Sequence, residues 1–350
     1  MKTVTVTASK TYSVHIGSGI LHSLGQQLSA AVPVHTAAMI SDSNVWPLYG
    51  QAAQKSLQDA GFRVVSYVFP AGEESKNGNT YLQILQFLAQ EQLTRSDCVI
   101  ALGGGVVGDL AGFVAATFLR GIAYVQVPTT LLAAVDSSVG GKTAIDLPAG
   151  KNLAGAFCQP KLVLCDIDTL QTLPEDTFRD GCAEVIKYGI LYDEALFSLL
   201  ERHGLDFDRE TVIARCVELK RDVVAADEFD RGARQKLNLG HTLGHGVEKN
   251  SHFALSHGKA VAIGTAMISR ISSRMGWCDP ALAERVEHLL EKFCLPTATH
   301  YTPEQLYQAA LSDKKRAADT VTLVIPREIG LCDLCPTPVA QLKSLIETGY

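Results

Sequence analysis

Four of the ten histidines of this 350-residue chain lie within seventeen positions, and three of them, His241, His245 and His257, are candidates for chemistry. His241 and His245 are four residues apart, so on a helix both imidazoles lie on one face, and His257 can return on the next element. Three protein ligands with a fourth coordination position open are typical of catalytic zinc sites. The same spacing also occurs among ordinary core and helix-capping histidines, and the pattern alone leaves that alternative open.

A glutamate and a lysine stand three residues apart in an otherwise apolar segment. Glu184 and Lys187 share a face if this segment is helical. Such a pair is often a surface salt bridge, but a buried carboxylate needs a cation or a metal beside it. Together with the histidines, Glu184 is therefore the natural carboxylate ligand. Arg234 and Asn238 precede His241 at helical spacing. If the segment is one helix, this spacing predicts that the Arg234 guanidinium lies on the same face as His241 and can bind an anion.

A glycine-rich loop spans Gly103-Gly-Gly-Val-Val-Gly-Asp109. It contains Gly-x-Gly-x-x-Gly between a predicted strand and a predicted helix, the context in which backbone amides and a helix N-terminus hold a pyrophosphate. The acidic ribose partner expected about twenty residues later is replaced by Pro128-Thr-Thr130. We therefore predict a dinucleotide site of non-standard architecture, with Asp42 and Asn44 as candidates for the ribose or adenine. A tight turn with close helix packing is the alternative.

The segment Asp136-Ser-Ser-Val-Gly-Gly-Lys-Thr143 ends like a P-loop. Asp136 stands where the P-loop has its first glycine, so a nucleoside-triphosphatase reading is weak. Lys142, Lys151 and Asn152 still form a short stretch of anion-binding types. Solvated lysines are the alternative reading of this stretch.

Charge and composition indicate which kinds of ligand and which cell compartment to expect. A net charge of −6 gives no general attraction to nucleic acid or to an anionic membrane, so we expect a small-molecule partner, no nucleic acid and no membrane. The apolar run from Cys98 to Leu119 contains one charged residue, but its glycines favour a buried strand, a turn and a helix over a membrane span. Nine scattered cysteines and an N-terminus without a signal-peptide pattern predict a cytoplasmic protein.

Alternating patterns predict an α/β first half with a mostly parallel, Rossmann-like sheet. After a hairpin over residues 4–16, strands are expected at 36–40, 63–69, 97–102, 123–127 and 162–166, with helices at 47–60, 80–90 and 109–119. Helices are then expected at 175–202, 210–227, 234–249, 257–275, 280–293 and 303–311, with one strand at 321–325. The length also favours two domains. We predict a nucleotide-binding domain over 1–174 and a mainly α-helical metal- and substrate-binding domain over 175–350.

Taken jointly, these motifs resemble the 3-dehydroquinate synthase family of sugar-phosphate cyclases over nearly the whole chain. The matching segments are Gly103–Asp109, Phe118–Gly121, Pro128–Thr130, Asp136–Asp146, Gly150–Asn152, Ala183–Gly189, Asn238–His245, His257–Gly258 and Asp313–Lys315. The resemblance implies conversion of 3-deoxy-D-arabino-heptulosonate 7-phosphate to 3-dehydroquinate and phosphate in the shikimate pathway of aromatic amino acid biosynthesis. It implies a lyase that uses NAD and zinc, with cobalt or another divalent metal as an alternative.

The resemblance also implies a role for each site residue. Zinc would be bound by Glu184, His241 and His257, while His245 turns to the substrate, although the spacing alone favours His241 with His245. NAD would lie along Asp42, Asn44, Glu73, Lys76, Gly104, Gly105, Val106, Asp109, Thr129, Thr130, Lys151 and Thr172. The phosphorylated sugar-acid substrate would contact Asp136, Lys142, Asn152, Lys187, Lys220, Arg234, Asn238, His245 and Lys314 or Lys315, with Arg120 supplied by the neighbouring subunit of a homodimer.

Three other functions remain alternatives. A sister cyclase would act on a different phosphorylated sugar, but the presence of both Lys220 and Arg234 favours a substrate with a carboxylate. A metal- and NAD-dependent polyol dehydrogenase would release NADH in proportion to turnover. A non-catalytic dinucleotide sensor would need neither a metal nor the pair of Glu184 and His257.

Overall fold

The computed structural model describes residues 1–252, 254–311 and 319–350, and these form two compact units. The first unit comprises Met1–Pro174 and Arg209–Phe229, and the second comprises Glu175–Asp208 and Asp230–Tyr350. Helix α7 (Arg209–Ala226) belongs to the first unit, where it packs on strand β1 (Lys2–Thr7). This differs from the expected simple division at residue 174. As a boundary between domains that fold independently, that division stays a prediction.

A seven-stranded sheet forms the centre of the first unit. Its strands run in the order β1-β2-β9-β6-β5-β3-β4, and every neighbouring pair is parallel except the opening hairpin of β1 and β2. The predicted mostly parallel sheet is therefore confirmed. The remaining strands are β2 Thr11–Gly17, β3 Thr36–Asp42, β4 Arg63–Phe69, β5 Cys98–Gly103, β6 Ala123–Pro128 and β9 Leu162–Asp166.

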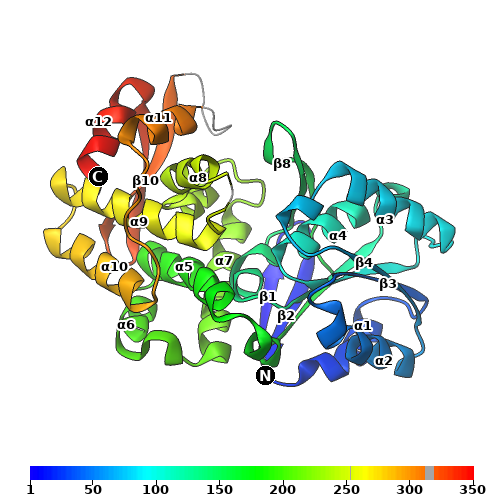
Figure 1. The fold of residues 1–350 in the computed structure, drawn as a ribbon. Helices are drawn as coiled ribbons and strands as arrows, with labels where there is room; N and C mark the ends of the chain where they lie inside the picture. Colours follow the sequence, from blue (N-terminus) through cyan, green and yellow to red (C-terminus); the bar gives the residue numbers. More distant parts are fainter. Residues whose placement is uncertain (253, 312–318) are drawn as a thin grey trace. The chain divides into compact units, whose positions relative to one another are not determined.

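Helices cover both faces of this sheet (Figure 1). Side chains alternate along a strand, so Ala38 and Ile40 of β3 face one side while Ala37 and Met39 face the other. The first pair packs with α3 (Gly78–Gln90) and α4 (Gly105–Thr117), and the second with α1 (Leu24–Ala31) and α2 (Gln51–Asp59). Buried on both faces, β3 and β5 are almost uninterrupted apolar runs.

An antiparallel hairpin of β7 (Lys142–Leu147) and β8 (Gly150–Phe157) was not predicted. Its alternation is hard to detect because β8 is largely solvent-accessible and contains two glycines. Gly140 and Gly141 have φ values of 90° and 70° and turn the chain into β7. Lys142 therefore begins a strand, whereas a P-loop lysine begins a helix, so the resemblance to a P-loop has no structural counterpart.

The second unit is mainly helical, as predicted. Its helices are α5 Glu175–Tyr192, α6 Glu194–His203, α8 His241–Asn250, α9 His257–Arg274, α10 Pro280–Lys292, α11 Pro303–Leu311 and α12 Val339–Gly349. The expected lone strand is instead a hairpin of β10 (Thr320–Glu328) and β11 (Leu331–Pro338). The helix predicted over 175–202 is divided at Asp193, whose carboxylate accepts a hydrogen bond from Leu196 N and caps α6.

The helix predicted over 234–249 is also two elements. A 3₁₀ helix at Ala233–Asn238 ends before Gly240, whose φ is 74°, and α8 begins at His241. A Cβ atom on Gly240 would lie 2.3 Å from Thr265 Oγ1 of α9, so both the conformation and the contact require glycine. Arg234 and Asn238 therefore do not share a helix face with His241, which corrects the prediction.

Among the described residues, no helix combines the length and the apolar character needed to cross a membrane.

Candidate active site

Glu184 and Lys187 lie in the buried part of α5, which is inaccessible to solvent from Gly181 to Leu191. Their exposed fractions are 1% and 2%, and they form an ion pair. The interpretation as a surface salt bridge is therefore wrong. A carboxylate at this depth carries a large desolvation cost, and nearby positive charge is needed to keep it ionised.

Two histidines bring their rings to the same carboxylate. His241 is the first residue of α8 and His257 the first residue of α9. Glu184 Oε1 lies 3.8 Å from His241 Nε2 and 3.7 Å from His257 Nε2. Ligand atoms around a tetrahedral zinc ion are roughly 3.3 Å apart, so a small contraction accommodates the ion. One carboxylate and two imidazoles are a donor set that fits zinc or a similar divalent cation, with a fourth position left for a small molecule.

The second nitrogen of each ring also has a neighbour. His241 Nδ1 is 3.0 Å from the carbonyl oxygen of Leu239, which can only accept, so Nδ1 carries the hydrogen and Nε2 the lone pair. His257 Nδ1 is 3.7 Å from Oε2 of buried Glu248. Burial alone would lower the pKa of His257, but the carboxylates of Glu184 and Glu248 outweigh it and raise the pKa to about 9. The two acids thus draw positive charge to this position.

Glu248 lies beside the candidate ligands, and the sequence analysis missed it. It follows His245 by three positions and His241 by seven, so helical spacing could have identified it. In the described part of the chain, two donor groups have all their ligand atoms within 4.8 Å of one another: Glu184 with His241 and His257, and His245 with Glu248 and His257. His241 and His245 do not occur together in either group, although their ring centroids are 5.4 Å apart. The structure thus brings together Glu184, His241 and His257, the set that the family resemblance implies. It does not combine His241 with His245, the pair that the spacing suggests.

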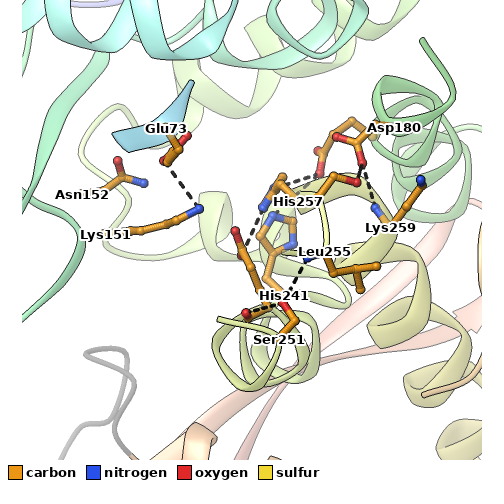
Figure 2. Close-up of polar contacts among 12 residues, drawn as sticks. Glu73, Lys151, Asn152, Asp180, His241, Ser251, Leu255, His257 and Lys259 are labelled. Carbon is orange, nitrogen blue, oxygen red and sulfur yellow. Dashed lines mark hydrogen bonds and ion pairs between the residues drawn. The ribbon is translucent and has the colours of Figure 1, made fainter. Parts of the chain in front are cut away.

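Close contacts between helices bring these side chains together (Figure 2). A Cβ atom on Gly258 of α9 would lie 2.0 Å from the carbonyl oxygen of Asp180 on α5. One on Gly244 of α8 would lie 2.8 Å from the carbonyl oxygen of Ala260 on α9. No side chain fits in these gaps, so glycine allows the three backbones to approach closely enough for one carboxylate and two imidazoles to meet.

In the first unit, the predicted nucleotide-binding residues follow the carboxyl ends of the parallel strands. Register aligns these ends, because Asp42 of β3 pairs with Phe69 of β4, and Gly103 of β5 with Pro128 of β6. After β3 the chain moves outward to β4 and then returns to β5 on the other side of β3. This reversal is the topological switch point at which open α/β sheets bind ligands.

The glycine-rich loop lies at this switch point, between β5 and the start of α4. The first amides of a helix have no partners within the helix, and Gly104, Gly105 and Val106 supply them here. Thr129 N donates to Gly103 O at 3.0 Å, while the buried Thr129 Oγ1 has no hydrogen-bond partner among the described residues. The loop therefore presents amide and hydroxyl donors suited to a pyrophosphate.

A buried lysine links several of the predicted residues. Lys76 Nζ lies 2.7 Å from Asp109 Oδ2 and donates to Asn152 Oδ1 at 2.5 Å. Burial by itself lowers the pKa of Lys76, but Asp109 and Glu73 outweigh burial and raise the pKa, so the ammonium stays charged. Lys151 Nζ lies 3.5 Å from Glu73 Oε1, as Figure 2 shows. These predicted NAD residues thus form one polar cluster with Asn152.

Other residues predicted to bind the nucleotide form hydrogen bonds with neighbours in the first unit. Asp42 Oδ1 accepts hydrogen bonds from Asn44 N at 2.8 Å and Val45 N at 3.0 Å, so this carboxylate shapes its own turn. Thr172 Oγ1 is 2.5 Å from the hydroxyl of Tyr49, a neighbour that the sequence pattern did not indicate. Thr130 Oγ1 accepts a hydrogen bond from Ala133 N at 3.2 Å.

Family descriptions match most of the chain. The 3-dehydroquinate synthase N-terminal description covers residues 66–180, and the C-terminal description covers residues 181–316. A 3-dehydroquinate synthase from Pelobacter propionicus is 46% identical over 342 residues, which is 95% of each chain. The chain belongs to the 3-dehydroquinate synthase family.

Two solved structures share the fold of this chain over nearly its whole length. A 2-deoxy-scyllo-inosose synthase complexed with carbaglucose-6-phosphate, NAD⁺ and Co²⁺ has a TM-score of 0.89, 25% identity and full coverage of both chains. A 2-epi-5-epi-valiolone synthase from Streptomyces hygroscopicus, with NAD⁺ and Zn²⁺ bound, has a TM-score of 0.89 and 26% identity, covering 99% of this chain and 98% of its own. The α/β and helical architecture is thus that of the sugar-phosphate cyclases.

Substrate residues that the family resemblance implies occur in both units. In the first unit, Lys220 of α7 donates to Asp136 Oδ1 at 2.8 Å and to the Asp136 carbonyl oxygen at 2.6 Å. Lys142 begins β7 and Asn152 lies on β8. Arg120 follows α4 with a φ of 68°. In the second unit, Arg234 and Asn238 lie on the 3₁₀ helix before α8, Lys187 on α5 and His245 on α8. Lys314 and Lys315 lie outside the described residues.

Proposed function

We propose that this chain catalyses the 3-dehydroquinate synthase reaction, converting 3-deoxy-D-arabino-heptulosonate 7-phosphate to 3-dehydroquinate and phosphate. The observation that carries the proposal is the convergence of Glu184, His241 and His257 from three helices, in a chain 46% identical to a 3-dehydroquinate synthase. The enzyme is a phosphate-eliminating cyclase, and therefore a lyase.

Two cofactors complete the proposal. NAD would be held at the carboxyl ends of β3 to β6 by the glycine-rich loop and the Lys76 cluster, and its reversible oxidation of a substrate hydroxyl makes a neighbouring carbon–hydrogen bond acidic. A divalent metal would be held by Glu184, His241 and His257 and would supply Lewis acidity toward the substrate hydroxyls. Zinc fits the donor set, and cobalt or another divalent metal is the alternative.

The chain's own residues bind the two charged ends of the substrate. We assign the carboxylate to Lys220 and Arg234, because a guanidinium presents a flat fork that matches a carboxylate. Both cations are buried, so their charges favour an anionic partner, and Asp136 helps to hold Lys220 in place. We assign the phosphate to Lys142, Asn152 and His245, with Arg120 added by a second copy of the chain. Lys187, Asn238 and one of Lys314 or Lys315 complete the set of substrate residues.

Elimination needs a base for the activated carbon–hydrogen bond. The departing phosphate has basic oxygens and lies beside that bond, so we infer that phosphate takes the proton as its carbon–oxygen bond breaks. The protein's task is then to orient the phosphate, which is what cationic and amide donors do. Because NAD would be regenerated within the cycle, ring opening and an internal aldol step would give the carbocycle with no net redox change.

Assembly and location are part of the proposal. A homodimer is needed if Arg120 is to reach the site of its neighbour. Nine free cysteines, of which Cys98, Cys165 and Cys332 are deeply buried, are compatible with a reducing cytoplasm.

A phosphate-release assay with purified protein, NAD and zinc tests the function directly. We expect turnover of 3-deoxy-D-arabino-heptulosonate 7-phosphate and none of sedoheptulose 7-phosphate. Turnover of the second substrate alone would make the protein a sister cyclase. Absorbance of reduced nicotinamide should stay flat during turnover, whereas steady accumulation of NADH would identify a dehydrogenase.

A further inference from the structure

The N-terminus of α9 is capped by a residue from another helix. Ser256 precedes His257 at the capping position, yet within the described residues its side chain makes no capping hydrogen bond to its own helix. Asp180 of α5 does this instead. Its Oδ1 accepts a hydrogen bond from Lys259 N at 2.9 Å and another from Ser256 Oγ at 2.5 Å. Figure 2 shows Asp180 beside both Lys259 and His257.

This contact joins α5 and α9, two of the three helices that carry the proposed metal ligands. Asp180 lies four residues before Glu184, one turn away on the same helix. The amide that it accepts belongs to Lys259, two residues after His257. Gly258 lets the backbones meet, since a Cβ atom there would lie 2.0 Å from the Asp180 carbonyl oxygen. The start of α9 is therefore fixed against the turn of α5 that precedes Glu184.

We propose that Asp180 is a positioning residue for the metal centre: its carboxylate caps α9 and thereby sets where His257 presents its imidazole to Glu184 and His241. The inference rests on the proposed function, because it assumes that these three side chains bind a divalent metal. Asp180 has no ligand role in it. A carboxylate at a helix N-terminus accepts orphan amides and complements the helix dipole, so its removal frees the first turn of α9 to shift.

The chain offers a matched control on the same two helices. Asp176 lies one turn before Asp180 and pairs with Lys259 Nζ at 3.1 Å, so it also joins α5 to α9. That carboxylate is 71% exposed and binds the end of a flexible side chain, not the helix backbone. Asp176→Ala therefore removes an acidic contact between the same elements while the start of α9 keeps its cap.

Metal affinity is the decisive measurement, made on full-length protein after metal removal by chelator dialysis. We expect Asp180→Ala to weaken zinc binding by roughly 10- to 100-fold in competition with a chromogenic chelator. The visible absorption of the cobalt-loaded protein should also change, since it reports the geometry of the ligands. Asp180→Asn keeps an acceptor oxygen and should restore most of the affinity, and Asp176→Ala should bind zinc like the unmodified chain.

The outcomes distinguish a failure of the positioning role of Asp180 from a failure of the proposed function. Unaltered zinc affinity and cobalt absorption in Asp180→Ala would overturn the positioning role, as would an equal loss in Asp176→Ala. If Asp180→Ala does not fold, Ser256→Ala removes one of the two hydrogen bonds to the carboxylate, and an affinity equal to that of the unmodified chain would then count against the inference. Failure of the unmodified chain to bind any divalent metal would instead refute the proposed function.

Discussion

His257 lies between two buried carboxylates, and each of its ring nitrogens faces one of them. Glu184 is on the Nε2 side with His241, whereas Glu248 is on the Nδ1 side. Carboxylates that accept a hydrogen from the non-ligating nitrogen fix the tautomer and the ring orientation of metal-binding histidines. If Nε2 binds the metal, as we propose, Glu184 would share the metal and Glu248 would orient the ring, although both acids are buried and both lie within 4 Å of the same imidazole.

Loss of the proposed ligand Glu184 should abolish metal binding and activity together. We expect Glu184→Ala to retain no tightly bound zinc in metal analysis after dialysis. The metal-free variant should also be less stable than the metal-free parent by about 3–5 kcal/mol in urea unfolding, because Lys187 stays buried without this carboxylate. His288→Ala, an exposed histidine on α10, should keep metal and activity. Full activity in Glu184→Ala would refute the ligand assignment.

Glu248→Gln should have a smaller effect than loss of a ligand. The amide keeps the shape of the side chain and an acceptor oxygen, but removes the negative charge beside His257 Nδ1. We expect zinc affinity about tenfold weaker, with a metal stoichiometry of one per chain at saturating zinc. If this variant binds no zinc even at saturation, Glu248 is itself a ligand and the second donor group, with His245, is the correct one.

At the scale of elements, the close contact between α8 and α9 brings the helix starts that carry His241 and His257 together. Gly244→Ala would place a methyl group 2.8 Å from the Ala260 carbonyl oxygen, so the helices must separate. We expect a loss of about 1–3 kcal/mol in unfolding free energy and weaker zinc binding.

Gly246→Ala on the same helix is the control. Its Cβ atom would lie no closer than 3.5 Å to any neighbour, and alanine favours a helix over glycine, so stability should stay equal or rise by up to ~1 kcal/mol. Equal losses in both variants would show that helix propensity, and not the close approach, controls this pair.

Elements with strong hydrophobic periodicity could be predicted from the sequence. The fully buried β3, β5 and β9 are short apolar runs bounded by polar residues, and the alternation of strands with helices is sufficient to predict a parallel sheet. The β7–β8 hairpin could not be predicted, because both strands are partly exposed and β8 contains two glycines. The break at Gly240 was missed since the segment 234–249 keeps a helical pattern across it.

The candidate site was predictable only in part. Residue types and motif order are local features, so the histidines, Glu184 and the glycine-rich loop could be identified. The ligand set depends on how α5, α8 and α9 pack, and spacing along one helix cannot report that packing. Asp180 carries no motif of its own, and its proposed role depends on a tertiary contact with the start of α9. Glu248 lies at helical spacing from His245, but its approach to His257 also depends on tertiary packing.

At the scale of the whole molecule, thiol reactivity should follow burial. Burial raises the pKa values of Cys98, Cys165 and Cys332 to about 12, so almost no reactive thiolate exists at pH 8. Cys294 is exposed. We expect Cys294 to be the fastest-reacting thiol of the native protein, with that reaction lost in Cys294→Ser, while the three buried thiols react only after unfolding. Fast modification of any of these three would contradict the described packing.

The discontinuous make-up of the first unit bears on how the protein is assembled during synthesis. Helix α7, which covers β1 and supplies Lys220, is translated after residues 175–208 of the other unit. A ribosome must therefore produce Phe229, and then the length of chain that fills its exit tunnel, before the nucleotide-binding half can be completed. Residues 175–208 leave the tunnel earlier, but they cannot complete their packing until α8 and α9 of the same unit have been synthesised. Translation speed near residue 230 is thus expected to affect the yield of folded enzyme more than its final stability.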